Sequence, residues 1–218
     1  MNNNCKTFPK YTLQRLTDYL NILYQLKVKR TESVSSGELA KMLGITDVQV
    51  RKDLTCFDSI GKRGVGYDVN RFIEAIEDQL GLNKEYSVII IGAGRLGTAL
   101  MNYKRLSQAK FSIKAAFDIS KEKIRKTINN VKIHDIDHLE EYLLNNETDI
   151  AVFTVPATEV EELYKIIEKS NVKAILNFTP SIVKDTENII VRNLDIVSDF
   201  KILAYKIKEK NNADKNFR

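Results

Sequence analysis

The stretch from Tyr86 to Leu100 constrains the fold of this 218-residue chain more than any other. An apolar run over 86–91 leads into the pattern Gly-x-Gly-x-x-Gly, and a helix-forming segment follows. The first glycine permits a tight turn, the second lets backbone N–H groups approach a pyrophosphate, and the third lets the helix pack close to the strand. The start of that helix also attracts phosphate charge. Strand, glycines and helix together predict a dinucleotide site that includes Gly92, Ala93, Gly94, Arg95, Leu96 and Gly97.

An acidic residue follows the second apolar run at the spacing that such a site requires. Asp118 ends the run 111–117 and lies about 20 residues beyond the glycines. A carboxylate at this place binds the ribose hydroxyls and repels a 2′-phosphate. The sequence therefore predicts NAD, as NADH or NAD⁺, as the cofactor rather than NADP(H). The alternative is that Asp118 is only a solvated turn residue, and the preceding glycines favour the ligand role.

From residue 86 onward, apolar runs alternate with amphipathic segments. This alternation predicts a doubly wound parallel sheet with helices on both faces. Strands are expected at 86–91, 111–117, 149–154 and 173–177, with a weaker one at 188–192, and helices near 95–106, 137–146 and 158–170. A last helical segment is expected over 195–210, beginning at Asp195.

The part of the chain before the fingerprint reads as a separate, mainly helical module. A helix is expected over 12–27, a second after Ser35 or Ser36 that ends at Gly44, and a third from a capping box at Thr46 to about Phe57. The short turn between the second and third helices is typical of a helix-turn-helix. A glycine-rich hairpin over 61–67 and a fourth helix, capped by Asn70 and ending at Gly81, complete the module.

The third helix is the candidate for reading DNA. At 100° per residue, Val50, Leu54 and Phe57 share a core-facing side, and the other side carries Gln49, Arg51, Lys52 and Thr55. Such side chains can meet base edges or phosphates in the major groove. Lys62 and Arg63 at the hairpin tip would act as a wing, and an arginine there suits a narrow A·T-rich minor groove. The alternative is an ordinary solvated face, and the basic hairpin favours DNA.

Composition argues against membrane-spanning, secreted, disulfide-bonded and metal-binding proteins. The chain has no apolar run long enough to cross a membrane, and its first residues lack a signal sequence, so we expect a cytoplasmic protein. Cys5 and Cys56 lie in unrelated contexts, which argues against a disulfide and against a metal site. The net charge of +5 permits a polyanionic partner without requiring one.

Taken together, these motifs resemble the Rex family of redox-sensing transcriptional repressors of Gram-positive bacteria. The resemblance extends from about residue 10 to 207 and rests on six segments in the family's order: 49–54, 61–67, 92–97, 117–118, 154–156 and 176–180. It implies a homodimer of winged-helix domains (1–83) and Rossmann domains (84–194), with a C-terminal helix and tail (195–218) swapped onto the partner. It also implies that the NAD⁺-bound or cofactor-free dimer holds operator DNA, here an A·T-rich palindrome, and that NADH releases it.

The resemblance also assigns roles to single residues. Tyr103 matches a tyrosine near the nicotinamide, Asp195 matches the carboxylate it meets in the closed form, and Pro156, Asn177 and Phe178 match the lining of the nicotinamide end. The chain departs from the family at two positions. Asn21 replaces a basic switch residue on the first helix, and Asp58 replaces a glycine near the end of the third.

The competing interpretation is a small NAD-dependent dehydrogenase, or a cofactor-binding regulatory subunit without redox-controlled DNA binding. Only about 120 residues follow the fingerprint, which suffices for the sheet and last helix but leaves no catalytic domain. No Tyr-x-x-x-Lys pair falls on an expected helix at a useful place, and hydride transfer usually needs such a positioned acid or base. We therefore expect no catalytic residue and no metal.

Overall fold

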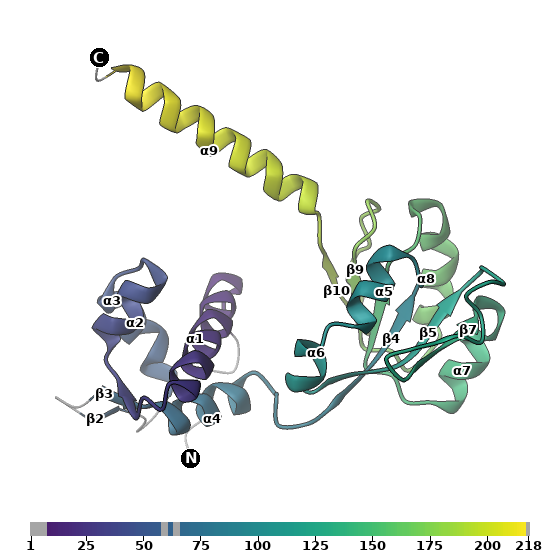
Figure 1. Ribbon diagram of the computed structural model, residues 1–218, viewed down its shortest axis with the longest axis horizontal. Helices are drawn as coiled ribbons and strands as arrows, with labels where there is room; N and C mark the ends of the chain where they lie inside the picture. The colour runs from purple at the N-terminus through teal and green to yellow at the C-terminus, as the bar shows by residue number, and fades with distance from the viewer. Residues whose placement is uncertain (1–7, 58–60, 63–65, 217–218) are drawn as a thin grey trace. The chain divides into compact units, whose positions relative to one another are not determined.

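The computed structural model describes residues 8–57, 61–62 and 66–216 (Figure 1). The chain divides into two compact units, and the boundary falls between Lys84 and Glu85. Each unit has its own buried core, so each is described by itself.

The N-terminal unit packs helices around one apolar core. Its helices are α1 (Lys10–Val28), α2 (Ser36–Leu43), α3 (Asp47–Asp53) and α4 (Val69–Gln79). Tyr19, Leu23, Phe72 and Ile76 are fully buried where these helices meet. A small antiparallel sheet has the order β1 (Ser33–Val34), β3 (Gly66–Asp68) and β2 (Gly61–Lys62). The hairpin of β2 and β3 was expected, and β1 was not.

Local capping explains both ends of α2 and the starts of α3 and α4. The Ser35 hydroxyl accepts from the N–H of Glu38 at 3.1 Å, the Glu38 carboxylate accepts from the N–H of Ser35 at 2.7 Å, and Gly44 ends α2 at φ +66°. The third helix is shorter than expected, because a 3₁₀ turn over Leu54–Cys56 replaces its last turn. The expected cap of α4 at Asn70 is wrong. Asp68, which already pairs in β3, accepts from the N–H of Arg71 at 2.9 Å instead.

The expectation that the cysteines form no disulfide is also wrong. Cys56 is disulfide-bonded, and its partner lies outside the described residues. The rings of Phe8 and Phe57 stack with centroids 6.5 Å apart, so the first described residues lie beside the end of the α3 region. Sequence spacing could not show this, because the approach depends on tertiary packing.

The C-terminal unit is built on a seven-stranded sheet of order β10-β9-β8-β4-β5-β7-β6. All neighbours are parallel except β6 and β7. The strands are β4 (Tyr86–Ile91), β5 (Phe111–Asp118), β6 (Thr127–Ile128), β7 (Val131–Asp135), β8 (Ile150–Phe153), β9 (Ala174–Asn177) and β10 (Ile190–Asn193). Sequence analysis missed β6 and β7, although the buried Val131 and Ile133 alternate as in a strand.

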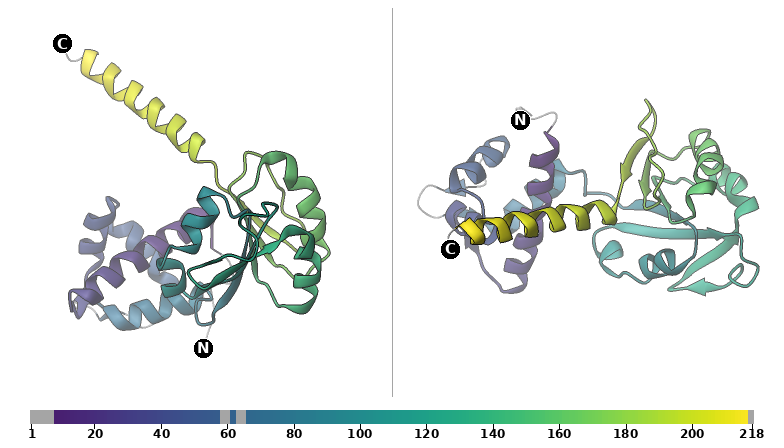
Figure 2. Two further views of the ribbon diagram at one scale, coloured as in Figure 1. Left: turned by 45° about the vertical axis from the view of Figure 1, so that its right-hand side comes forward. Right: turned by 90° about the horizontal axis from the view of Figure 1, so that it is seen from above.

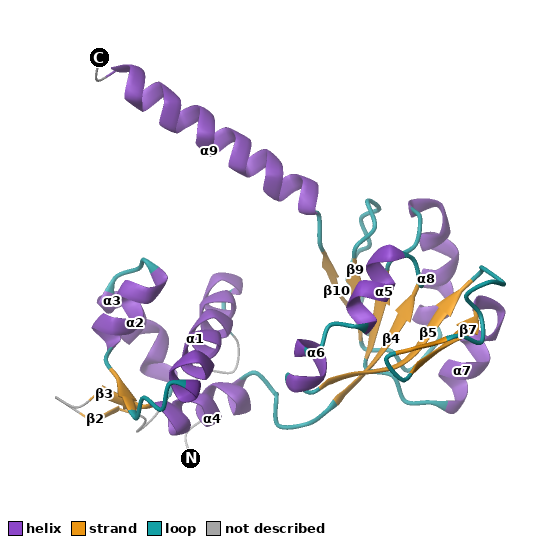
Figure 3. Ribbon diagram, viewed as in Figure 1, coloured by secondary structure: helices purple, strands orange, loops and turns teal. Residues whose placement is uncertain are grey.

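Helices cover both faces of the sheet unequally (Figure 3). Helices α7 (Leu139–Asn145) and α8 (Val160–Glu168) pack on the face that carries Ile89 and Ile91. On the face of Val88 and Ile90, Met101 of α5 (Arg95–Met101) packs above the strands. The expected continuous helix over 95–106 breaks before α6 (Arg105–Gln108). The Asn129 amide donates to the carbonyl of Met101 at 2.9 Å and takes the place of a helical N–H.

Part of that second face has no helix of its own over it. Side chains of β4, β8, β9 and β10 line an apolar hollow of about 320 Å³, and Leu100, Leu106 and Phe111 border it. The chain crosses from β9 to β10 without a helix and then continues into α9 (Ile196–Asn216) (Figure 2). Seven large apolar side chains of α9 are more than half exposed: Ile196, Val197, Phe200, Ile202, Leu203, Tyr205 and Ile207. Among the described residues, no helix is both long and apolar enough to span a membrane.

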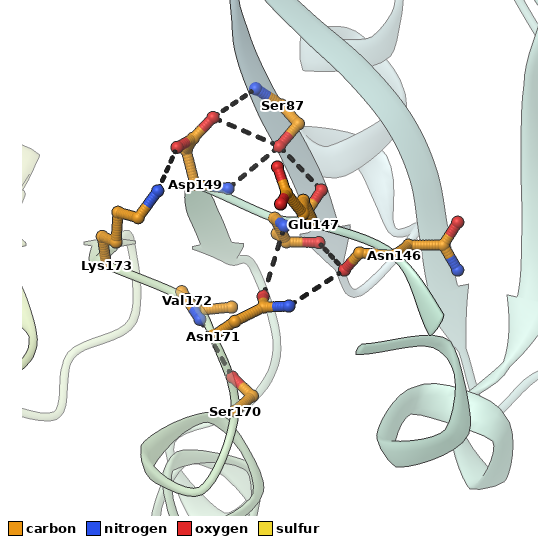
Figure 4. Close-up of polar contacts among 9 residues, drawn as sticks. Ser87, Asn146, Glu147, Asp149, Ser170, Asn171, Val172 and Lys173 are labelled. Atoms are coloured by element: carbon orange, nitrogen blue, oxygen red, sulfur yellow. Dashed lines mark hydrogen bonds and ion pairs between the residues drawn. The ribbon is translucent and has the colours of Figure 1, made fainter. Parts of the chain in front are cut away.

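A polar network fixes the amino-terminal edge of the sheet (Figure 4). The Asp149 carboxylate accepts from the backbone N–H of Ser87 at 3.0 Å and from Lys173 Nζ at 3.0 Å. The Ser87 hydroxyl donates to the carbonyl of Glu147 at 2.9 Å, and the Asn171 amide donates to the carbonyl of Asn146 at 3.3 Å. Because β4, β8 and β9 run parallel, their other ends lie together at the opposite edge, which carries the glycine loop.

Candidate functional site

The turn after β4 requires glycine at its first position. Gly92 has φ +102°, and a Cβ there would lie 2.6 Å from the carbonyl oxygen of Thr154. Its N–H donates to the carbonyl of Phe117 at 2.8 Å, which ties the turn to the end of β5. The Thr154 hydroxyl donates to the carbonyl of Gly92 at 2.6 Å. Thr154 therefore holds the loop from the end of β8, a role that the sequence did not reveal.

Glycine is needed at the other two positions of the loop for different reasons. A Cβ on Gly97 would lie 2.1 Å from the carbonyl oxygen of Gly92, so only glycine lets α5 pack against the turn. A Cβ on Gly94 would meet no protein atom within 4 Å. Gly94 borders a cavity, and the space that a side chain would fill there is open to that cavity. This open cradle fits the pyrophosphate of a dinucleotide.

Asp118 lies at the edge of the same cavity and organises it. One carboxylate oxygen accepts from the N–H of Ala93 at 2.8 Å, and the other accepts from the N–H of Ser120 at 2.8 Å. Lys123 Nζ also donates to Asp118, at 3.1 Å, and its side chain is 40% exposed. No role was predicted for Lys123 from the sequence. The one feature that could have indicated it is a positive charge five residues after Asp118, the predicted ribose ligand.

The cavity has a volume of about 600 Å³ and lies at the carboxyl ends of the strands. Among the described residues that line it, Lys123 is the only cation, and five residues carry carboxylates: Asp118, Asp137, Glu140, Glu159 and Glu162. Carboxylates that gather around a site repel further negative charge. The lining therefore disfavours ligands that carry a phosphate beyond the pyrophosphate.

The predicted cofactor residues divide into two groups. Gly92, Gly94, Asp118 and Pro156 line the cavity. The lining does not include the other predicted residues, Ala93, Arg95, Leu96, Gly97, Tyr103, Asn177 and Phe178. Asn177 is fully buried, and its amide donates to the carbonyl of Ser181 at 2.6 Å and to Asn193 Oδ1 at 2.8 Å. It joins the ends of β9 and β10, and its predicted cofactor role stays a prediction.

In the N-terminal unit, α3 has one buried and one exposed side. Thr46 caps it, accepting from the N–H of Gln49 at 3.1 Å. Val50 and Leu54 are buried in the core, as the helical spacing predicted. The exposed side carries Val48, Arg51 and Lys52, and Thr55 is exposed in the 3₁₀ turn that follows. Arg51 Nη1 donates to Asp47 Oδ2 at 2.6 Å, one helical turn earlier.

The capping box predicted at Thr46 is only half correct, because Thr46 caps α3 but the Gln49 side chain does not complete the box. The Gln49 amide donates instead to Asp53 Oδ1 at 2.8 Å. Asp53 is 5% exposed and also accepts from Arg15 Nε and Nη2, at 2.6 and 2.7 Å, and from the Tyr19 hydroxyl at 2.9 Å. Burial opposes ionisation of this carboxyl, but the hydrogen bonds from Arg15, Tyr19 and Gln49 outweigh it and lower the pKa of Asp53. The network locks α3 onto α1.

The remaining predicted site residues are those of the hairpin wing and those of the redox switch. Lys62 lies in β2, paired with Gly66, whereas Arg63 and Asp58 lie outside the described residues. Asn21 is exposed on α1, and Tyr103 is half-exposed between α5 and α6. Asp195 caps α9. It accepts from the Ser198 hydroxyl at 2.5 Å and from the N–H of Val197 at 3.0 Å, and the pKa of its carboxyl is lowered chiefly by the Ser198 hydrogen bond.

Comparisons with known proteins match this two-part organisation. Residues 7–55 match a family model described as a putative DNA-binding protein N-terminus, and residues 83–181 match one described as a CoA binding domain. The chain is 38% identical over 204 residues to the redox-sensing transcriptional repressor Rex of Clostridium botulinum, covering 94% of this chain and 97% of that protein. It is 36% identical over 200 residues to the Rex protein of Carboxydothermus hydrogenoformans, covering 92% and 96% of the two chains.

Solved structures match over nearly the whole chain. The Rex-family repressor RSP in complex with β-NAD⁺ and operator DNA has a TM-score of 0.88 at 29% identity, covering 97% of each chain. The RSP complex with β-NADH has a TM-score of 0.86 at 29% identity, covering 97% of this chain and 99% of that one.

Proposed function

The chain belongs to the Rex family of redox-sensing transcriptional repressors, and we propose that it binds operator DNA as a homodimer that NADH releases. It is a regulator, not an enzyme. The observation that carries the proposal is the pairing, in one chain, of a glycine cradle beside Asp118 with a helix-turn-helix unit that exposes Arg51 and Lys52. RSP, which shares the fold over nearly its full length, is solved with both nicotinamide cofactors and with operator DNA.

The proposed cofactor is NAD(H). Gly92 and Gly94 would receive the pyrophosphate, and Gly97 would let α5 start close to that turn. Asp118 would bind the adenosine ribose, and Pro156 would lie at the nicotinamide end. Ala93, Arg95 and Leu96 complete the loop and the start of α5, and Tyr103, Asn177 and Phe178 remain candidates for the nicotinamide end. When bound, the cofactor supplies a charge difference, since reduction removes the positive charge of the nicotinamide ring.

Cofactor choice gives the first test. NADPH should bind at least about tenfold more weakly than NADH, a difference of ~1.4 kcal/mol, because its 2′-phosphate meets Asp118 and an acidic lining. Calorimetric titration measures both affinities. Asp118→Asn should narrow the gap, and Lys123→Gln should widen it, because Lys123 is the cation that could pair with the extra phosphate. Equal affinities of the wild type for the two cofactors would contradict the assignment.

The proposed DNA surface is the exposed side of α3 together with the wing. Arg51, Lys52 and Thr55 would enter the major groove, and Lys62 and Arg63 would approach the adjacent minor groove of an A·T-rich palindrome. Gln49 takes a different part, because its amide is bound to Asp53 and the residue orients α3.

The proposed homodimer rests on two apolar surfaces. The hollow over β4, β8, β9 and β10 presents only apolar area, and α9 carries exposed apolar side chains on more than one side. At 100° per residue, Phe200 and Leu203 fall on one stripe, whereas Ile202 and Tyr205 fall elsewhere, which is typical of a helix buried on several sides. A second copy of α9 covering this hollow would give the swapped helix that the resemblance implies.

Three residues are proposed for the switch. Tyr103 would read the nicotinamide and meet Asp195 in the closed dimer, and Asn21 would leave Asp195 without the charged partner usual in the family. A ligand shifts a two-state equilibrium only by its difference in affinity for the two states. NADH and NAD⁺ differ in the charge of the nicotinamide ring, and this charge is what can give them different affinities for the two states.

The test is a gel shift on A·T-rich genomic fragments with added NAD⁺ or NADH. Saturating NADH should weaken operator binding by about 5- to 150-fold, the usual range of coupling between two sites, and operator should weaken NADH binding by the same factor. Tyr103→Phe should blunt the response while keeping NADH binding, and Lys52→Ala should weaken DNA binding under both conditions. An operator complex that survives saturating NADH would remove the redox-sensing role.

A further inference from the structure

An exposed apolar side chain, Val48, lies at the start of the charged face of α3. Val48 is 62% exposed and is followed on the same side by Arg51 and Lys52, three and four residues later. The pattern of the third helix predicted base contacts from its polar residues and gave no role to Val48. A single exposed valine needs no special explanation on an ordinary surface. Val48, however, lies on the face proposed to enter the major groove, where an apolar side chain can contact an apolar group of a base.

The contacts around Val48 fix its direction. Gln49, the next residue, is held by Asp53, which is itself locked to α1 by the two hydrogen bonds from Arg15. Asp47, the preceding residue, is held by Arg51. The contacts of Asp53 with Arg15 and Tyr19 tie α3 to α1, so α3 cannot rotate about its axis without breaking this buried network. A valine in a helix also keeps one strongly preferred rotamer, so ordering it against a partner costs little entropy.

The major groove offers one apolar group for such a side chain. Base edges there present nitrogen and oxygen donors and acceptors, except for the C5-methyl group of thymine. The N-terminal residues of a recognition helix are the ones that contact base edges, and Val48 lies in the first turn of α3. The two positive charges beside it would meanwhile hold the phosphates or guanine edges.

We propose that Val48 is a specificity-determining residue that packs against the methyl group of one thymine in each operator half-site. The inference rests on the proposed function, since it requires α3 to enter the major groove. It assigns A·T preference to the recognition helix as well as to the wing, and it predicts that the preference persists when the minor-groove contact is weakened.

The experiment removes the methyl group from the DNA and the side chain from the protein. An operator identified by gel shift is rebuilt with deoxyuridine in place of thymine, one symmetric pair of positions at a time. At one pair the wild type should lose about fifteenfold in affinity, which is about fourfold for each buried methyl group. Val48→Ala should bind the thymine operator with a similar loss and should lose nothing further with deoxyuridine at that pair. A minor-groove contact cannot produce this coupling, because the methyl group lies in the major groove.

The matched control is Met42→Ala, which removes another exposed apolar side chain, 53% exposed, from the neighbouring helix α2. It should keep the full response to deoxyuridine. Independent, additive losses for Val48→Ala and deoxyuridine at every thymine would overturn the inference while leaving a NADH-released operator complex, and therefore the proposed function, intact. Absence of any operator complex with the wild-type protein would remove both.

Discussion

Replacing both Phe200 and Leu203 by Asp should convert the proposed dimer to a monomer and abolish tight operator binding. The two side chains are 67% and 54% exposed on α9, so their apolar surface lacks cover within one chain. Burying one such side chain contributes roughly 1.5–3 kcal/mol, and a symmetric dimer buries four of them, which gives about 6–12 kcal/mol. Sedimentation velocity measures the oligomeric state, and a gel shift measures the operator affinity.

The control for this double variant is Leu144→Asp, which places the same charge on a 79% exposed apolar residue of α7. It should remain dimeric and bind operator as the wild type does. A dimer that persists in the double variant at micromolar concentration would contradict the proposed role of α9. If the double variant is monomeric, its affinity for NADH shows whether one subunit alone forms a complete cofactor site.

Asp53→Asn should lower the free energy of unfolding of the N-terminal unit by ~3 kcal/mol, the cost of breaking a buried ion pair by removing one partner. The change leaves Arg15, 24% exposed, without its bidentate partner. Hydrogen exchange at the amides of α1 and α3 measures the stability of the N-terminal unit alone. This is needed because a chain of two units need not unfold in one step. Amides of β4 should be unaffected.

Asp47→Asn is the matched control, since it removes the other aspartate of α3 that binds an arginine at 2.6 Å. Both members of that pair are about half exposed, so the loss should not exceed about 0.5 kcal/mol. An equal effect of the two substitutions would show that the buried network does not hold α3.

The contribution of Asp53 should also depend on pH in a definite direction. Its pKa is lowered in the folded protein, so its stabilisation is complete above the ordinary value of 3.8 and is lost as the pH falls through the folded pKa. The wild type and Asp53→Asn should therefore differ at neutral pH and converge below pH 3.8.

Interactions between near neighbours in the chain were accessible from the sequence. The N-cap Ser35 bonds a residue only three positions later, and Gly44 ends the helix because αL backbone favours glycine. The loop from Gly92 to Gly97 belongs to this class, because the turn, the open cradle and the close helix contact each require glycine within six residues. The side that α3 buries followed from helical period, as Val50 and Leu54 show.

Tertiary structure decided what depends on partners far along the chain. Asp53 and Gln49 look like part of a polar face until Arg15 and Tyr19, more than 30 residues earlier, are brought to them. The Asn129 amide ends α5 by taking the carbonyl of Met101 from 28 residues away. A sequence pattern records which side chains can form hydrogen bonds, whereas folding selects the partner. The sequence therefore determined the kind of ligand and the class of fold, and only the packed structure decided which residues face the ligand and which hold the helices.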